Sequence, residues 1–122
     1  RALTDKGDNT TYLNFEHNGK FIYFYGNQGS STVRVPQNSD TPLPIGYAVT
    51  LVIDDFDYSS VYVNTGNDTS NGLHISAVGF SQGYSNNNWW RLGSDENIGI
   101  YTIMKVDTNR WVLSGPSVLD DY

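Results

Sequence analysis

The stretch Gly99-Ile-Tyr-Thr-Ile-Met-Lys-Val-Asp-Thr-Asn-Arg-Trp-Val-Leu-Ser-Gly115 carries the clearest fold signal in the chain. Residues 99–106 and 110–114 each have the pattern of a β-strand, and only residues 107–109 connect them. A three-residue connection between two strands is typical of a β-hairpin. The sequence therefore predicts that the chain closes with an antiparallel hairpin.

Further strands are predicted upstream of this hairpin. The strongest is formed by residues 47–53, which are apolar almost throughout and are therefore expected to lie in the centre of a sheet. Residues 36–46 hold three of the four prolines and are expected to form a loop, because proline cannot donate to a sheet ladder. The other predicted strands span residues 12–16, 20–25, 31–35, 61–63 and 73–78.

The chain as a whole is predicted to be all-β. No stretch has the apolar spacing of an amphipathic helix, whereas turn signals recur roughly every 8–12 residues. We expect a single small antiparallel β-sandwich or barrel of about eight strands. Residues 1–122 are interpreted as one all-β module, and from the start at Arg1 we expect a fragment of a longer protein or a processed product. The expected core consists of Phe21, Val35, Leu51, Ile53, Ile100, Ile103, Trp111 and Leu113.

A long loop is expected over residues 79–97, with one short strand at its two tryptophans. Aromatic rings stack on sugar faces, so Tyr84, Trp89 and Trp90 are the candidate glycan contacts. Because adjacent strand residues point to opposite faces, one tryptophan ring should be buried and the other exposed. The favoured interpretation is structural: a tryptophan anchors the loop to the core or lies in a subunit interface, where aromatic residues are enriched.

The acidic cluster of Asp54, Asp55 and Asp57 follows the predicted central strand. Aspartate is common in tight turns, and a turn is the favoured interpretation. Calcium binding is the weaker alternative, because no glutamate stands at the closing position of an EF-hand loop. The sequence thus gives no firm metal site and no cofactor.

Catalytic signals are weak, so we interpret the chain as not being an enzyme. His17 lies in an Asn-Gly turn and is expected to be solvated, while His74 is expected on the solvent side of a strand. The chain has no cysteine and no nucleophile-elbow motif. Glu16 and Glu96 are the only glutamates, and a glycan hydrolase that uses them as a carboxylate pair is the least favoured alternative.

Charge and composition narrow the range of partners. The formal net charge is −6, and the lysines and arginines are scattered singly, which argues against a nucleic-acid partner. No apolar run approaches the roughly 20 residues of a membrane span, so no membrane insertion is expected. Only 16% of the residues are charged, a composition common among extracellular and virion-exposed β-proteins.

Several segments together resemble a β-module that recurs in the virion proteins of tailed bacteriophages. Val33-Arg-Val-Pro-Gln-Asn-Ser39 matches a strand end of the form V-x-V-P-x-N-S, and Pro44-Ile-Gly46 matches the P-x-G turn that follows. The closing stretch quoted above matches the hairpin pattern I-x-K-x-x-x-N-x-W-x-L-x-G and is the most specific part. The resemblance covers about two thirds of the chain, and residues 79–97 form an insertion relative to it.

The resemblance implies a structural protein of the virion, of the tail-fibre, head-fibre or capsid-decoration type. Other virion proteins are then the expected partners, and the virion surface, tail or capsid the expected location. Fibre proteins of this kind are commonly trimers, so a homotrimer is expected. The strand at residues 20–25 agrees with self-association, because both its faces are apolar or aromatic. Host attachment by binding a surface glycan remains the alternative function, and the resemblance supplies no catalytic residue.

Overall fold

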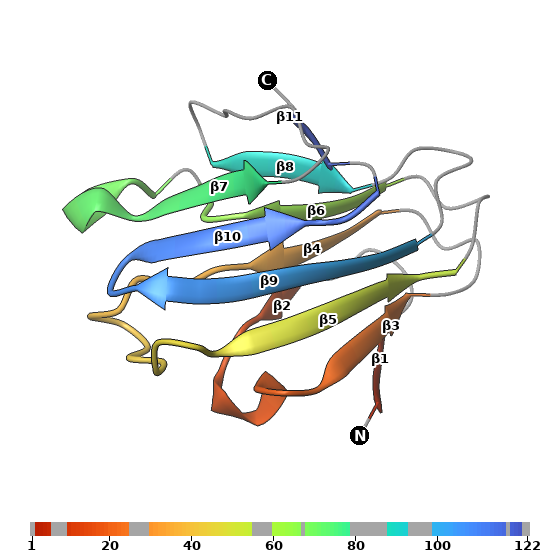
Figure 1. The fold of residues 1–122 in the computed structure, drawn as a ribbon, viewed down its shortest axis with the longest axis horizontal. Helices are drawn as coiled ribbons and strands as arrows, with labels where there is room; N and C mark the ends of the chain where they lie inside the picture. Colours follow the sequence, from red (N-terminus) through yellow and green to blue (C-terminus); the bar gives the residue numbers. More distant parts are fainter. Residues whose placement is uncertain are drawn as a thin grey trace.

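The computed structural model describes residues 2–5, 10–24, 30–54, 60–66, 68–78, 88–92, 99–116 and 118–120. These residues form two β-sheets that lie one in front of the other (Figure 1). The front sheet has the order β1 (Ala2–Asp5), β3 (Phe21–Phe24), β5 (Ala48–Ile53), β9 (Gly99–Asp107), β10 (Arg110–Ser114) and β7 (His74–Val78). The rear sheet has the order β11 (Val118–Asp120), β8 (Trp89–Leu92), β6 (Ser60–Asn64), β4 (Ser30–Arg34) and β2 (Thr10–Tyr12).

Successive strands from β1 to β8 alternate between the two sheets. Parallel neighbours need a crossover connection, and here each crossover runs through the opposite sheet. The parallel pairs are β1–β3, β3–β5, β2–β4, β4–β6 and β7–β10, whereas β5–β9, β9–β10, β6–β8 and β8–β11 are antiparallel. The prediction of an all-β chain is confirmed, but the prediction of an antiparallel arrangement is wrong, because both sheets are mixed. The described residues also form more strands than the eight expected.

The strand predicted to be central is central. β5 lies between β3 and β9 in the front sheet, and its side chains alternate strictly between the interior and the outer side. Val49, Leu51 and Ile53 are buried, while the residues between them are half-buried on the outside. Because both faces of the strand are partly covered, its sequence is apolar almost throughout.

The closing hairpin is also confirmed. β9 and β10 pair in antiparallel fashion, with a register shift between Arg110 and Trp111. β9 continues to Asp107, so only Thr108 and Asn109 connect the strands, one residue fewer than predicted. The Asp107 carboxylate accepts a hydrogen bond from the Thr108 N–H at 2.8 Å.

The core lies between the sheets and is built around large aromatic side chains. Tyr47 and Trp111 are fully buried and meet edge to face, with their ring centroids 5.5 Å apart. Two of the eight expected core residues are exposed: Phe21 at 39% and Ile100 at 64%. In both strands the neighbouring residue points inward, and a one-residue error in alternation moves a side chain to the other face. The other six expected core residues are buried.

A buried lysine ties the hairpin to the proline-rich loop. Lys105 is only 2% exposed, and its Nζ donates hydrogen bonds of 2.7 Å to Asn38 Oδ1 and to the Leu43 carbonyl oxygen. The Asn38 N–H in turn donates to Asn109 Oδ1 at 2.9 Å. Burial lowers the pKa of Lys105, because the charged amine has lost most of its contact with water. The conformation of the loop therefore depends on side chains of the hairpin.

Replacing this lysine should destabilise the fold. Lys105→Ala removes two charge-assisted hydrogen bonds and leaves the buried Leu43 carbonyl without its donor, so we expect a loss of about 2–4 kcal/mol in the free energy of unfolding. Urea titration followed by tryptophan fluorescence measures it. Lys20→Ala, the same change at a half-buried lysine, should cost less than about 0.5 kcal/mol. Equal losses in the two variants would contradict the role given to Lys105.

His17 is buried rather than solvated, which corrects the expectation drawn from the sequence. It ends the short 3₁₀ helix η1 (Phe15–His17), and its Nδ1 accepts a hydrogen bond from the Asn14 N–H at 3.1 Å. Asn14 Oδ1 accepts from the Glu16 N–H, so the two side chains cap the helix reciprocally. Burial lowers the pKa of His17, and an accepting Nδ1 requires the unprotonated state.

The free energy of unfolding should therefore depend on His17 in mild acid. The unfolded chain takes up a proton near pH 6.5, whereas the folded chain takes it up only at lower pH. The stabilisation from neutral His17 is thus present above about pH 6.5 and is lost as the pH falls towards the folded-state pKa. Urea titrations at several pH values between about 7.5 and 5 should show a smaller decrease in His17→Gln than in the wild type. A decrease in His17→Gln as large as that of the wild type would contradict the assignment.

Candidate functional site

The outer face of the front sheet consists mostly of uncharged side chains. Strand alternation turns every second residue of β3, β5, β7, β9 and β10 to this side. The strand register aligns them in rows, for example Tyr23, Val52 and Ile100. We define the outer face as Phe21, Tyr23, Ala48, Thr50, Val52, His74, Ser76, Val78, Ile100, Thr102, Met104, Val106, Arg110, Val112 and Ser114.

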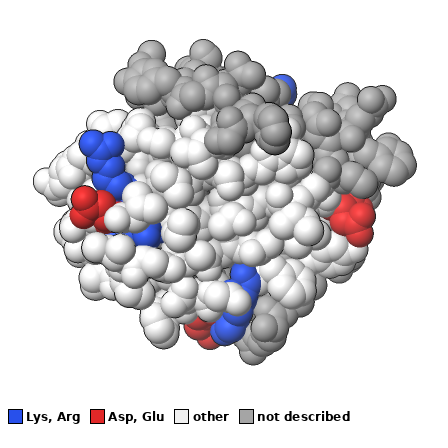
Figure 2. All heavy atoms as spheres, in the orientation of Figure 1, with Lys and Arg blue, Asp and Glu red and all other residues white. Residues whose placement is uncertain are grey.

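Large apolar side chains on the outer face are in contact with solvent. Five large apolar side chains of this face are exposed: Phe21, Val78, Ile100, Met104 and Val106. Two charged side chains border the outer face: Arg110 at one end of the sheet, and Asp54, which follows β5 and bonds to the Tyr23 hydroxyl. Figure 2 shows the same side of the molecule, with the charged atoms of the described residues at its margins and a broad uncharged centre. Hydroxyl side chains stand among them, as in the row of Thr50, Thr102 and Ser114, so the face is mostly uncharged and partly apolar. Exposed apolar side chains gathered on one face can mark an interaction site.

The structure separates the tryptophans proposed as glycan contacts. The short strand expected at this position is β8, and its alternation buries one ring, as predicted. Trp90 is completely buried, and its Nε1 donates to the Ile75 carbonyl oxygen at 3.1 Å. Trp89 is half-buried, and its ring lies 6.4 Å from that of Tyr62 between centroids. Trp90 therefore joins the two sheets, and Tyr84 lies outside the described residues.

The acidic cluster is described only in part. Asp54 is exposed at the end of β5 and accepts a hydrogen bond of 2.6 Å from the Tyr23 hydroxyl. Asp55 and Asp57 lie outside the described residues. Within the described part of the chain, no group of three or more histidine, aspartate and glutamate side chains is placed to hold a metal ion.

Among the described residues, those considered for catalysis do not form a catalytic pair. His17 is buried within its helix cap, and Glu16 is exposed beside it. His74 lies half-buried on the outer side of β7, as expected, and Glu96 falls outside the described residues. Among the described helices, none is long and apolar enough to cross a membrane.

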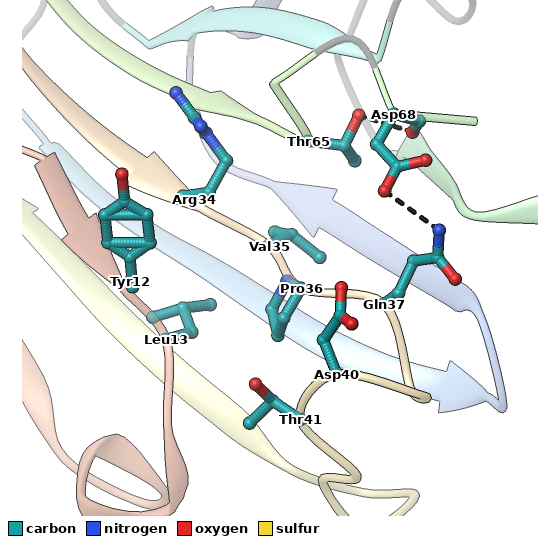
Figure 3. A pocket seen from close by; sticks show the side chains of 10 residues that line it. All are labelled: Tyr12, Leu13, Arg34, Val35, Pro36, Gln37, Asp40, Thr41, Thr65 and Asp68. Atoms are coloured by element: carbon teal, nitrogen blue, oxygen red, sulfur yellow. Dashed lines mark hydrogen bonds between the residues drawn. The ribbon is translucent and has the colours of Figure 1, made fainter. Parts of the chain in front are cut away.

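A hollow of about 250 Å³ opens where β2 and β4 end (Figure 3). Leu13, Val35 and Pro36 supply apolar lining. The polar and aromatic side chains around them are Tyr12, Arg34, Gln37, Asp40, Thr41, Thr65 and Asp68. This site is not recognisable in the sequence, because its residues come from separate segments of the chain. The one available signal was the polar run that interrupts the apolar pattern after Val35.

Comparison with known proteins gives no relative for this chain. No protein-family model matches it, and neither a curated protein nor a solved structure matches. Functional arguments therefore rest on the outer face, on the hollow and on the sequence resemblance described above.

Because Trp90 is buried, its replacement should lower the stability of the fold. Replacement of a glycan contact would instead weaken binding. Trp90→Ala should lower the free energy of unfolding by about 3–5 kcal/mol, because it opens a cavity between the sheets and removes a buried hydrogen bond. Trp89→Ala should cost distinctly less, since that ring is half-buried. Thermal and urea unfolding of both variants measure the difference. A Trp90→Ala protein with wild-type stability would show that this ring is not part of the core.

Proposed function

We propose that the chain is a structural module of a tailed-bacteriophage virion, of the fibre or surface-decoration type, that works through protein–protein assembly. The observation that supports this most directly is the outer face of the front sheet. The resemblance of the closing hairpin and of the segment 33–39 to the phage module adds the virion context. In this proposal the protein is not an enzyme, and its partners are copies of itself and other virion proteins.

The outer face has the composition of a protein interface. Interface centres are depleted in charged side chains and enriched in aromatic residues and methionine. The outer face has Phe21, Tyr23 and Met104 within a group of aliphatic and hydroxyl side chains, and Arg110 stands only at its end. Water contact with this surface costs free energy that burial against a partner would recover.

The uncharged contact face is compatible with a second copy of the chain as the partner. The net charge of −6 makes two copies repel each other at a distance. An uncharged contact face keeps the like charges of the two copies at the margins, where solvent and salt screen them. The homotrimer expected from the family resemblance is the oligomer that we propose.

The carbohydrate-binding alternative needs a site other than the three aromatic residues suggested by the sequence. Trp90 cannot contact a ligand while it is buried between the sheets, which leaves Trp89 as the only one of the three suggested contacts with a described, partly exposed ring. The described residues offer the hollow in place of the tryptophan pair.

Two isoleucines allow a matched test of the assembly proposal. Ile100 lies on the outer face and is 64% exposed, whereas Ile45 lies in the proline-rich loop and is 63% exposed. Ile100→Asp should dissociate the oligomer, because it places a carboxylate in the interface. Ile45→Asp should leave the oligomer intact.

Sedimentation velocity or light scattering of the purified chain at roughly 0.1 mM, a concentration high enough to populate a weak complex, gives the native mass. We expect the wild type and Ile45→Asp to sediment above the 13.6 kDa of one chain, and Ile100→Asp to sediment at that mass with an unchanged circular-dichroism spectrum. A wild-type monomer at this concentration would contradict self-assembly. Imaging of intact particles would then decide whether another virion protein covers the face.

A further inference from the structure

The hollow at the ends of β2 and β4 has a fixed guanidinium group at one side. Arg34 Nε donates to Asn64 Oδ1 at 2.7 Å, and the guanidinium carbon lies 5.7 Å from the centre of the Tyr12 ring. On another side it packs against Gly66, where an added Cβ atom would come within 2.7 Å of Nη1. These contacts orient the group and leave the two Nη atoms without a hydrogen-bond partner among the described residues. Arg34 can therefore donate to a ligand without first giving up a bond.

Acceptors line the opposite part of the hollow (Figure 3). Asp68 accepts hydrogen bonds from the Ser70 N–H and from Gln37 Nε2, both at 2.9 Å. These bonds, that from Ser70 first, lower the pKa of Asp68 and keep it ionised. The Asp40 carboxylate is exposed and has no hydrogen-bond partner among the described residues. Donors and acceptors thus stand around one apolar floor.

We propose that this hollow binds a single neutral sugar unit, held between Arg34, Asp40 and the ring of Tyr12. Neighbouring sugar hydroxyls both donate and accept, so they can bridge a guanidinium donor and a carboxylate acceptor. The C–H face of a sugar ring suits the aromatic ring of Tyr12, which is 61% exposed, and the half-buried ring of Pro36. Leu13 and Val35 lie beneath them in the core.

Charge and size restrict the ligand further. The hollow has two carboxylates and one guanidinium, so its field disfavours uronic and sialic acids and favours uncharged sugars. A volume of about 250 Å³ is below the roughly 300–1,000 Å³ of sites for drug-sized ligands. One ring fits this space, whereas a longer saccharide would have to extend into solvent.

The inference is independent of the assembly proposal. The hollow is lined by β2, β4 and the loops that follow β4 and β6, and none of its residues belongs to the outer face. The Ile100→Asp variant should therefore bind a sugar as the wild type does. Loss of assembly and loss of sugar binding can be observed separately.

Titration with D-glucose, D-galactose, D-mannose and N-acetyl-D-glucosamine, followed by amide chemical shifts in ¹⁵N-labelled protein, tests the inference. At least one sugar should give saturable shifts at Arg34, Gln37 and Thr41 with a Kd on the order of 1–10 mM, as expected for one small ligand in an open site. Asp40→Asn and Tyr12→Ala should each weaken binding by about tenfold, the loss expected for one good contact. D-glucuronate should bind about tenfold more weakly than the best neutral sugar.

Phe15→Ala is the matched control for Tyr12→Ala, because Phe15 is 66% exposed and does not line the hollow. It should bind the sugar with the wild-type Kd. The inference is overturned if none of the four sugars saturates below about 50 mM, a bound set by weak monosaccharide affinities. It is also overturned if Asp40→Asn binds as the wild type does, or if D-glucuronate binds as tightly as the neutral sugars.

Discussion

The hydrogen bonds of the Lys105 ammonium are the constraint on which the rest of the structure depends. An ammonium group is costly to bury, so it is retained only where acceptors replace its water. Asn38 and the Leu43 carbonyl do so, and both belong to the proline-rich loop. That loop spans from β4 in the rear sheet to β5 in the front sheet. One side chain of the hairpin thus fixes how the chain passes between the two layers, which the apolar core alone would leave free to slide.

The same interaction gives a physical reason for the sequence pattern. The lysine and asparagine of the closing hairpin are Lys105 and Asn109, and both bind Asn38 of the V-x-V-P-x-N-S segment. The glycine that ends the pattern has a separate reason: a Cβ atom at Gly115 would come within 2.0 Å of the Tyr101 ring. These residues of the pattern therefore make contacts within the fold. The resemblance to the phage module rests on residues with a structural role and indicates no ligand.

The elements that could be predicted from the sequence are those set by residues close together in the chain. The hairpin of β9 and β10, the central β5 and the strand at the tryptophans follow from local alternation and turn length.

The parallel pairing could not be predicted from the sequence. It depends on which of the two sheets each strand joins, and both sheets offer an apolar interior. The inward or outward direction of Phe21 was equally undetermined, since Phe21 to Phe24 are all large and apolar or aromatic. His17 was misplaced because its environment is set by a cap and by packing, not by its turn-like neighbours. The hollow was missed because Arg34, Asp40 and Asp68 meet only after the loops have folded.

β3 has large apolar or aromatic side chains on both faces, and other strands of the front sheet also carry apolar side chains on the outer face. These additional apolar residues bear on function. A chain of this size needs one buried layer, and the space between the sheets already takes up its largest side chains. The further apolar residues of the outer face do not contribute to that layer, and in contact with water they reduce solubility. In the proposed assembly a partner would cover them, and their burial would then be favourable. The hollow lies away from that face. If both proposals hold, the front sheet would hold the module in place while the ends of β2 and β4 stay open to a ligand.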